Sequence, residues 1–273
     1  MRHQPVIGGV LLALSLGILA GCGNGSTSGT QAAAPPPAGG TSPGRQGTAQ
    51  NPGTGTLAGK TIVLDPGHNG GNGSHPAEIG KMVDIITARK ECDTTGADTK
   101  AGYSEHAFNW DVANRLQRLL RARGATVILT RPTDTGVGPC ITERAATGNR
   151  AHADAALSIH ADGAPASGHG FHIIEPIPIP GHNAKIVPAS DKLGLALRDA
   201  FHRGTGTPYS SYIGKNALNP RDDLGGLNLS TVPKVFIECG NMRNPGDATN
   251  LVNPRFREKI AESLTAGFEA YFS

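Results

Sequence analysis

The chain has 273 residues, which is enough for one domain or two. Its 38 Gly and 20 Pro make up about a fifth of the residues, so we expect part of the chain not to pack into a compact domain. The formal net charge of only +3 argues against a dedicated nucleic-acid-binding protein, and no apolar run is long enough for a permanent membrane-spanning helix.

Residues 1–22 have the features of a bacterial export signal. Arg2 precedes an apolar stretch over residues 6–20, which is too short to span a membrane comfortably. The stretch ends at Cys22 in the sequence Leu-Ala-Gly-Cys, which resembles the lipobox of bacterial lipoproteins. This resemblance implies lipidation of Cys22 and attachment to a membrane without a transmembrane helix. An ordinary signal peptide with an incidental cysteine is the alternative.

The next segment, residues 23–58, is rich in Gly, Ser, Thr, Pro, Ala and Gln, and Arg45 is its only charged residue. Such a composition cannot bury enough apolar surface to offset the entropy of ordering, so we expect a disordered tether. A flexible chain of this length has an r.m.s. reach of roughly 30–36 Å. The remaining residues, 59–273, have the size of one domain with a substantial core.

Within residues 59–273, short β-branched apolar runs alternate with amphipathic stretches of helical period. We expect strands over residues 60–65, 125–130, 155–160, 170–174 and 234–238, and helices over residues 104–123, 190–203 and from 254 onwards. Ser104 and Ser190 are candidate N-caps, and Pro254 suits the first position of the last helix. The alternation predicts a single α/β domain with a mostly parallel, twisted sheet and helices on both faces.

Residues 66–104 interrupt this alternation with a sequence rich in Gly, Asn, Asp and Thr. A long insertion between the first strand and the first helix is often functional. Cys92 in this insertion and Cys140 further on both lie in loop-like sequence, whereas Cys239 ends an apolar strand. We predict a Cys92–Cys140 disulfide and a buried, free Cys239. A cysteine-rich metal site is disfavoured because the chain has no C-x-x-C pair.

Four side chains that can bind metal or transfer protons lie where strands end or helices begin. His68 follows the first strand, Glu105 begins the first helix, and His160 and Glu238 end later strands. Because the carboxyl ends of parallel strands meet at one edge of a sheet, these side chains can converge there. Two histidines and one carboxylate suit a zinc site with an open coordination position, and the second glutamate can act as a general base. A single histidine at a strand end is more often merely packed or hydrogen-bonded.

Short motifs in this order identify a family. Asp-Pro-Gly-His at residues 65–68, Ser-Ile-His-Ala-Asp at 158–162, and Ile-Glu-Cys-Gly-Asn at 237–241, with Asn-Pro-Gly-Asp at 244–247, resemble the zinc-dependent N-acetylmuramoyl-L-alanine amidases of the amidase-3 family. The resemblance covers residues 59–273. The segment 167–172, the Leu-Asn-Leu stretch at 227–229 and the two loop cysteines are similar to the mycobacterial single-domain members in particular.

The resemblance implies that His68, Glu105 and His160 bind Zn²⁺ and that Glu238 is the catalytic glutamate. Glu78 and Glu91 compete with Glu105 as the third ligand, but neither begins a strongly patterned helix. Bound zinc polarises the scissile carbonyl and lowers the pKa of water, and Glu238 would move a proton from the attacking water to the leaving amine. A strand-end carboxylate paired with an arginine is the structural alternative for Glu238.

Other polar side chains have simpler interpretations. Asp65 is expected to shape a turn or to orient a metal ligand, and Arg131 and Arg144 to form salt bridges. The remaining histidines are expected to be structural or exposed; they are His75, His106, His152, His169, His172, His182 and His202.

Together these features predict an exported enzyme, lipid-anchored to the outer face of the cell membrane in the periplasm or cell wall. The resemblance implies that it cleaves the amide between N-acetylmuramic acid and the L-Ala of the peptidoglycan stem peptide. We expect a monomer that does not bind nucleic acid. Two other functions remain open: a zinc peptidase that cuts within the stem peptide, and a non-catalytic lipoprotein that binds peptidoglycan or regulates an amidase.

Overall fold

The computed structural model describes residues 55–273, which are organised by a six-stranded sheet. The strands are β1 (Thr61–Pro66), β4 (Thr126–Leu129), β5 (Ala155–Asp162), β6 (His172–Pro176), β7 (Leu218–Arg221) and β8 (Lys234–Asn241), in the spatial order β4-β1-β5-β8-β6-β7. Neighbours from β4 to β8 run parallel, whereas β6 pairs with β8 antiparallel and β7 runs parallel to β6. The prediction of a mostly parallel sheet is confirmed, and its β6–β7 edge is reversed.

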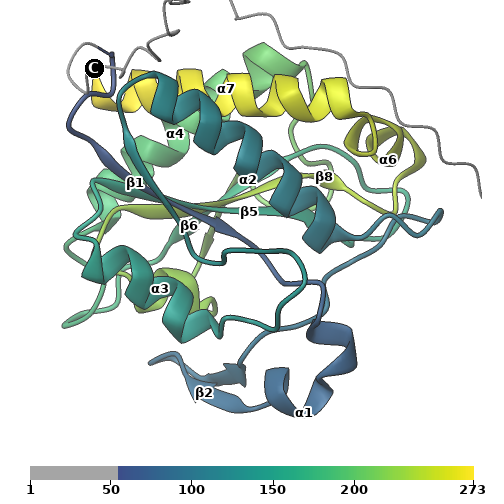
Figure 1. Cartoon of the computed structure of the whole chain (residues 1–273), viewed down its shortest axis with the longest axis horizontal. Coiled ribbons are helices and arrows are strands. Elements are labelled where there is room, and N and C mark those ends of the chain that lie inside the picture. The colour runs from purple at the N-terminus through teal and green to yellow at the C-terminus, as the bar shows by residue number, and fades with distance from the viewer. Residues whose placement is uncertain (1–54) are drawn as a thin grey trace, which may run out of the picture. The chain divides into compact units, whose positions relative to one another are not determined.

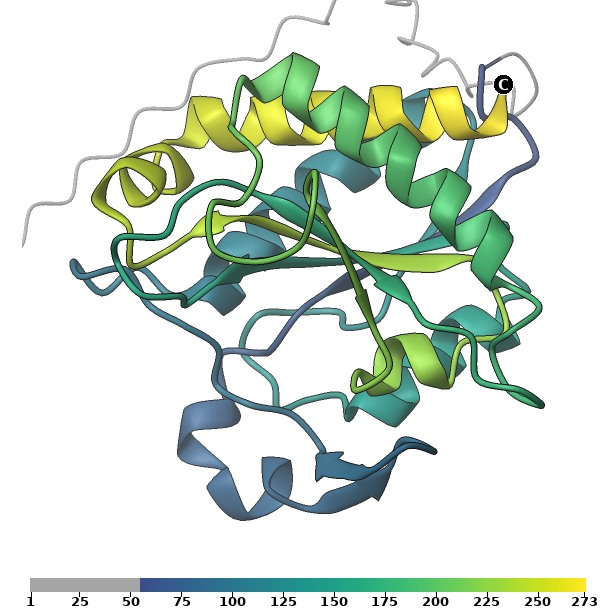
Figure 2. The ribbon, with the colours of Figure 1, turned by 180° about the vertical axis from the view of Figure 1, so that it is seen from behind.

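Helices cover both faces of the sheet, as Figures 1 and 2 show. On one face lie the long helices α2 (Glu105–Ala122), α4 (Val187–Thr205) and α7 (Pro254–Phe272), which enclose the larger apolar core. On the other face lie α3 (Ile141–Arg150) and the short α5 (Gly225–Asn228), with a smaller apolar cluster around Val63 and Ala156. The helix α6 (Pro245–Leu251) joins β8 to α7. The predicted α/β class with helices on both faces is confirmed.

The alternation of side chains along the strands decides what reaches each face. Leu157 and Ile159 on β5 point into the larger core. Because successive residues face opposite sides of a strand, His160 points to the other face, together with Glu238, its direct partner in the β5–β8 register. The sheet thus separates an apolar side from a side with functional polar residues.

The insertion after β1 forms a small subdomain of its own. It contains the 3-10 turn η1 (Asn72–Ser74), the short helix α1 (Pro76–Ile79) and a hairpin of β2 (Met82–Asp84) and β3 (Arg89–Glu91). These elements lie beyond the α3 side of the sheet (Figure 1). The Asn228 side chain at the end of α5 donates to the Ile85 carbonyl at 3.0 Å, so the hairpin is tied to the domain through a buried amide.

The helix starts differ in part from the sequence-based expectation. The α7 start is confirmed, since the Asn253 side chain accepts a hydrogen bond from the Arg255 N–H. Ser104 precedes α2 but makes no capping hydrogen bond. Ser190 as a cap is wrong: α4 begins at Val187, and the Ser190 hydroxyl instead accepts from the Lys234 N–H at 3.1 Å, which ties α4 to β8.

The folded domain begins before residue 59. Leu57 is fully buried in the larger core, and its N–H donates to the Arg123 carbonyl at 2.9 Å. Residues 55–58, expected in the tether, therefore pack with the domain. The export signal, Cys22 and the rest of the tether lie outside the described residues. Between residues 55 and 273, no helix has the length and apolar character to cross a membrane.

Candidate metal centre

His68 is held by the insertion on one side of its ring. It follows β1 with a positive φ of 57°, and its Nδ1 lies 3.0 Å from the Thr94 carbonyl and 3.3 Å from Asp93 Oδ1. Its Nε2 lies 3.3 Å from Glu105 Oε1. Burial opposes protonation, but Glu105 and Asp93 outweigh it and raise the pKa of His68 to about 10. The surrounding carboxylates thus favour positive charge at this point, which a metal cation can supply.

Glu105 connects the two histidines. It is the first residue of α2 and is buried, with Oε1 2.9 Å from His160 Nδ1 and Oε2 accepting the Ala97 N–H at 2.8 Å. Burial alone would raise its pKa, yet His68 and His160 hold the pKa of Glu105 well below its usual range. The carboxylate is therefore ionised, as a metal ligand must be.

The three side chains form a compact donor set. One ligand atom from each of His68, Glu105 and His160 lies within 4.8 Å of the other two. The His160 ring stacks on Phe236 at a centroid distance of 5.4 Å, which fixes its orientation. Hydrogen bonding of His68 Nδ1 to a carbonyl and a carboxylate is typical of metal-bound histidine. Two imidazoles and one carboxylate fit zinc with an open position.

Two glycines allow this close packing. A Cβ on Gly67 would overlap the His160 ring. A Cβ on Gly96 would lie 2.7 Å from His68 Cδ2 and 2.8 Å from Glu105 Oε2, and Gly96 also has a φ of +80°. Backbone from the β1 loop and from the insertion therefore approaches the donor set more closely than any other residue type would permit.

Glu238 lies beside the donor set on β8, opposite His160 in the sheet register. It lines the same cleft, while its Oε2 atom is buried with no hydrogen-bond partner in residues 55–273. Burial, with added repulsion from Glu105 and Asp162, raises the pKa of Glu238 well above its usual value. Glu238 forms no salt bridge there, so the structural alternative of an arginine partner is not supported.

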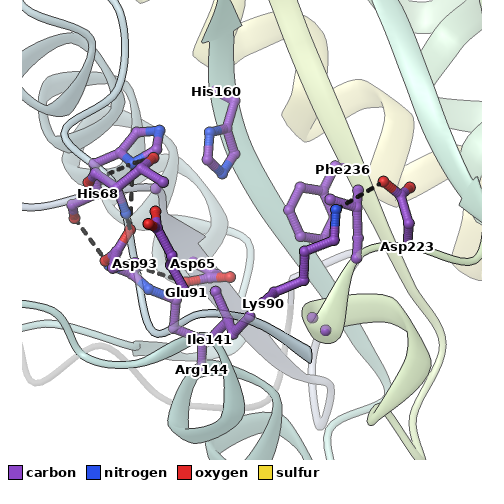
Figure 3. Close-up of a pocket in the computed structure, with 15 residues that line it drawn as sticks. Asp65, His68, Lys90, Glu91, Asp93, Ile141, Arg144, His160, Asp223 and Phe236 are labelled. Atoms are coloured by element: carbon purple, nitrogen blue, oxygen red, sulfur yellow. Dashed lines mark hydrogen bonds and ion pairs between the residues drawn. The ribbon is translucent and has the colours of Figure 1, made fainter. Parts of the chain in front are cut away.

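The cleft extends to both sides of the donor set. One part, drawn in Figure 3, is lined by Phe236, Leu224 and the insertion, and is bordered by the Lys90–Asp223 ion pair at 3.2 Å. The other part is lined by Glu238, Asp162 and two arginines, Arg221 and Arg243. Its volume is about 350 Å³. An extended substrate can therefore lie across the ligands with a different environment on each side.

A buried ion network supports the His68 loop. Arg144 donates to Asp65 at 3.0 Å, to Asp93 at 2.8 Å and to the His68 carbonyl at 3.0 Å. Lys234 donates to Asp65 at 3.1 Å, and these cations outweigh burial to hold the pKa of Asp65 well below its usual range. Arg144 thus forms the expected salt bridges, and Asp65 orients the ligand loop through Arg144 without contacting the donor set.

The structure brings Glu105, and not Glu78 or Glu91, next to the two histidines. Glu78 and Glu91 are exposed, and neither belongs to the group that could hold a metal. Sequence reasoning missed Asp93, which contacts His68 Nδ1, because the insertion offered no periodic pattern to place it. It also missed Phe236, although the apolar residue two positions before Glu238 had to share its face of β8.

The loop cysteines lie side by side as thiols. The Ile141 N–H donates to the Cys92 carbonyl at 2.8 Å, which brings Cys92 next to Cys140. Burial, followed by the contact with Cys140, raises the pKa of Cys92 to about 12. Cys239 is buried and free.

The sequence matches a family of known enzymes. Residues 62–270 match the family described as N-acetylmuramoyl-L-alanine amidase. The amidase Rv3717 of Mycobacterium tuberculosis is 39% identical over 220 residues, covering 80% of this chain and 88% of that protein. The chain belongs to the N-acetylmuramoyl-L-alanine amidase family. It is therefore a hydrolase.

Solved mycobacterial amidases also share the fold. The amidase Ami1 of Mycobacterium smegmatis aligns with a TM-score of 0.74 and 38% identity, covering 79% of this chain and 98% of that one. The apo form of Ami1 from Mycobacterium abscessus aligns with a TM-score of 0.73 and 39% identity, covering 79% and 99%. The matched range of the amidase family includes the whole donor set and Glu238.

Proposed function

We propose that this amidase uses zinc to hydrolyse the amide between the lactyl group of N-acetylmuramic acid and the L-Ala of the stem peptide in peptidoglycan. The observation that carries the proposal is the donor set of His68, Glu105 and His160 with Glu238 beside it, in a chain of this family. Peptidoglycan is the substrate that the family name implies.

The metal would be held by the three atoms that face one another: His68 Nε2, Glu105 Oε1 and His160 Nδ1. Bound zinc supplies Lewis acidity, which polarises the scissile carbonyl and makes water a better nucleophile at neutral pH. Asp93 and the Thr94 carbonyl keep the proton of His68 on Nδ1, so that Nε2 stays free to bind the metal.

Glu238 moves the proton. Its carboxylate accepts a proton as water attacks the carbonyl, and it then donates that proton to the leaving amine of L-Ala. Burial raises the pKa of Glu238, which makes its carboxylate a stronger base toward the attacking water. Once protonated, Glu238 can donate this proton to the leaving amine.

The cellular setting is a further part of the proposal, and it rests on the composition of residues 1–58 and on the cysteines. We propose that Cys22 carries a lipid and that the tether holds the enzyme near the outer face of the cell membrane, close to its polymeric substrate. We further propose that Cys92 and Cys140 form a disulfide after export, which would fasten the insertion to the start of α3.

Product analysis tests the function directly. The zinc-loaded protein is incubated with purified peptidoglycan fragments, and the products are identified by mass spectrometry. We expect intact stem peptides with a free L-Ala amine, and no such products from a Glu238→Ala variant.

Two other results would change the assignment. Shortened peptides still attached to sugar would make the protein a zinc peptidase. Bound but uncleaved fragments would favour the binding or regulatory lipoprotein.

A further inference from the structure

His172 lies next to the proposed catalytic base. It is the direct partner of Glu238 in the antiparallel β6–β8 register, so the two side chains share one face of the sheet. On the other side of Glu238 lies His160. The row His160–Glu238–His172 therefore places the base between a candidate metal ligand and a second, separate histidine.

Unpaired polar atoms concentrate at this place. In the described part of the chain, seven buried side-chain polar atoms lack a clear hydrogen-bond partner, and two of them, Glu238 Oε2 and His172 Nδ1, belong to this pair of neighbouring residues. The Tyr212 ring packs edge-on against His172 at a centroid distance of 6.0 Å. Buried polar groups without partners are costly, so such a concentration beside a catalytic group calls for a functional reason.

His172 has the properties of a neutral hydrogen-bond donor. The residue is only 2% exposed, and burial lowers its pKa to about 4 despite the nearby Asp162. At neutral pH the imidazole is therefore uncharged and carries one N–H. The sequence analysis expected this histidine to be structural or exposed, and the structure shows it buried.

We propose that His172 is a positioning residue for Glu238: its Nδ1–H donates to Glu238 Oε2 during the reaction and keeps Oε1 directed into the cleft. This inference rests on the role proposed for Glu238.

The reason lies in where a proton can go. A carboxylate with two free oxygens can be protonated on either, and a proton on the buried Oε2 could not reach the leaving amine. With Oε2 occupied as an acceptor, the proton from water binds Oε1 and is passed on from there. His172 keeps its own proton throughout, so it does not itself act as an acid or base.

The experiment measures kcat and KM of the zinc-loaded full chain on a defined muropeptide. For His172→Leu we expect kcat to fall about 10- to 100-fold, the value of a hydrogen bond to a charged group, with KM and zinc content little changed. His172→Asn places an N–H near the Nδ1 position and should recover most of the lost kcat. His172→Gln places its amide near Nε2 and should remain low. Because both amide variants are polar and of similar size, their difference stands even if His172→Leu folds poorly.

His182→Leu is the matched control, since it makes the same change at an exposed histidine outside the cleft, and its kcat should stay within about twofold of wild type. The proposal is overturned if His172→Leu keeps full kcat, if His172→Gln equals His172→Asn, or if His182→Leu loses as much kcat as His172→Leu. A Glu238→Ala variant with full activity would instead overturn the proposed function, independently of His172.

Discussion

At the scale of single residues, the donor set depends most on Glu105. Its two oxygens contact both histidines and the Ala97 N–H, so one carboxylate joins α2, β5 and the insertion. The sequence identified it through the family resemblance and because it begins a well-patterned helix. Its contact with Ala97 could not be predicted, because the path of the insertion is set by tertiary contacts.

We predict that Glu105→Gln lowers zinc affinity by more than about 100-fold, since even partners outside the ligand shell contribute 10- to 100-fold. The amide keeps the shape of the side chain but removes its charge. Competition with a chromophoric chelator measures the affinity. The control is Glu78→Gln, at an exposed residue, and it should bind zinc like wild type. Weaker zinc binding by Glu78→Gln alone would mean that Glu78, and not Glu105, is the third ligand.

Asp65 should link stability to pH. Asp65→Asn leaves Arg144 and Lys234 buried without their shared carboxylate, so we expect a loss of about 3–5 kcal/mol in unfolding free energy at pH 7. Because the folded-state pKa of Asp65 is lowered, its stabilisation is complete above the unfolded pKa of about 4 and is lost as pH falls further.

Urea unfolding of the chelator-treated protein between pH 3 and pH 7 tests this. The difference between wild type and Asp65→Asn should be constant above about pH 5 and shrink below about pH 4. The surface variant Asp199→Asn should change stability by less than about 0.5 kcal/mol. An equal difference at pH 3 and pH 7 would show that the Asp65 charge does not stabilise the fold.

At the scale of elements, strands with strong β-branched runs were predicted well and elements of low regularity were not. The core strands β1, β5 and β8 begin within one residue of their expected starts. By contrast, β7 has the sequence Leu-Asn-Pro-Arg, and β2 and β3 have three residues each. None of these strands shows a clear alternation of apolar and polar residues. The reversed direction of β6 also has no sequence signal, because an antiparallel strand can be as apolar as a parallel one when both of its faces are buried.

The hairpin should be held mainly by Asn228. Its Nδ2 donates to the Ile85 carbonyl at 3.0 Å and to the Thr87 hydroxyl at 3.1 Å, both between β2 and β3, and these bonds are buried or partly buried. We predict that Asn228→Ala speeds amide hydrogen exchange in residues 82–91 by about 10-fold or more while β5 and β8 stay protected. Lys90→Ala, which removes only an exposed ion pair with Asp223, should have little effect. Equal exchange rates in residues 82–91 of the Asn228→Ala and Lys90→Ala variants would show that Asn228 does not hold the hairpin in place.

At the scale of the whole molecule, the domain boundary matters for any shortened form. The composition of residues 23–58 predicts a segment that cannot form a core, but a composition average cannot detect one apolar side chain that packs into the domain, as Leu57 does. We predict that Leu57→Ala destabilises the domain by about 2–5 kcal/mol, because it empties a fully buried position.

Thermal unfolding measures this loss, and Thr56→Ala, at an exposed neighbour, should leave the melting temperature nearly unchanged. A chain starting at residue 59 should lose at least as much stability as Leu57→Ala. If Leu57→Ala and the shortened chain both unfold at the wild-type temperature, Leu57 does not stabilise the fold.

The insertion and the metal centre share residues, and this ties the behaviour of one to the other. Asp93 and Thr94 contact His68, while Ala97 contacts Glu105, so the ordered insertion and the bound ion stabilise each other by the same free energy. On the zinc-dependent function proposed above, removal of zinc is expected to loosen residues 66–104 first. The loosened segment would then be open to proteolysis, so the survival time of the enzyme would depend on the zinc available to it.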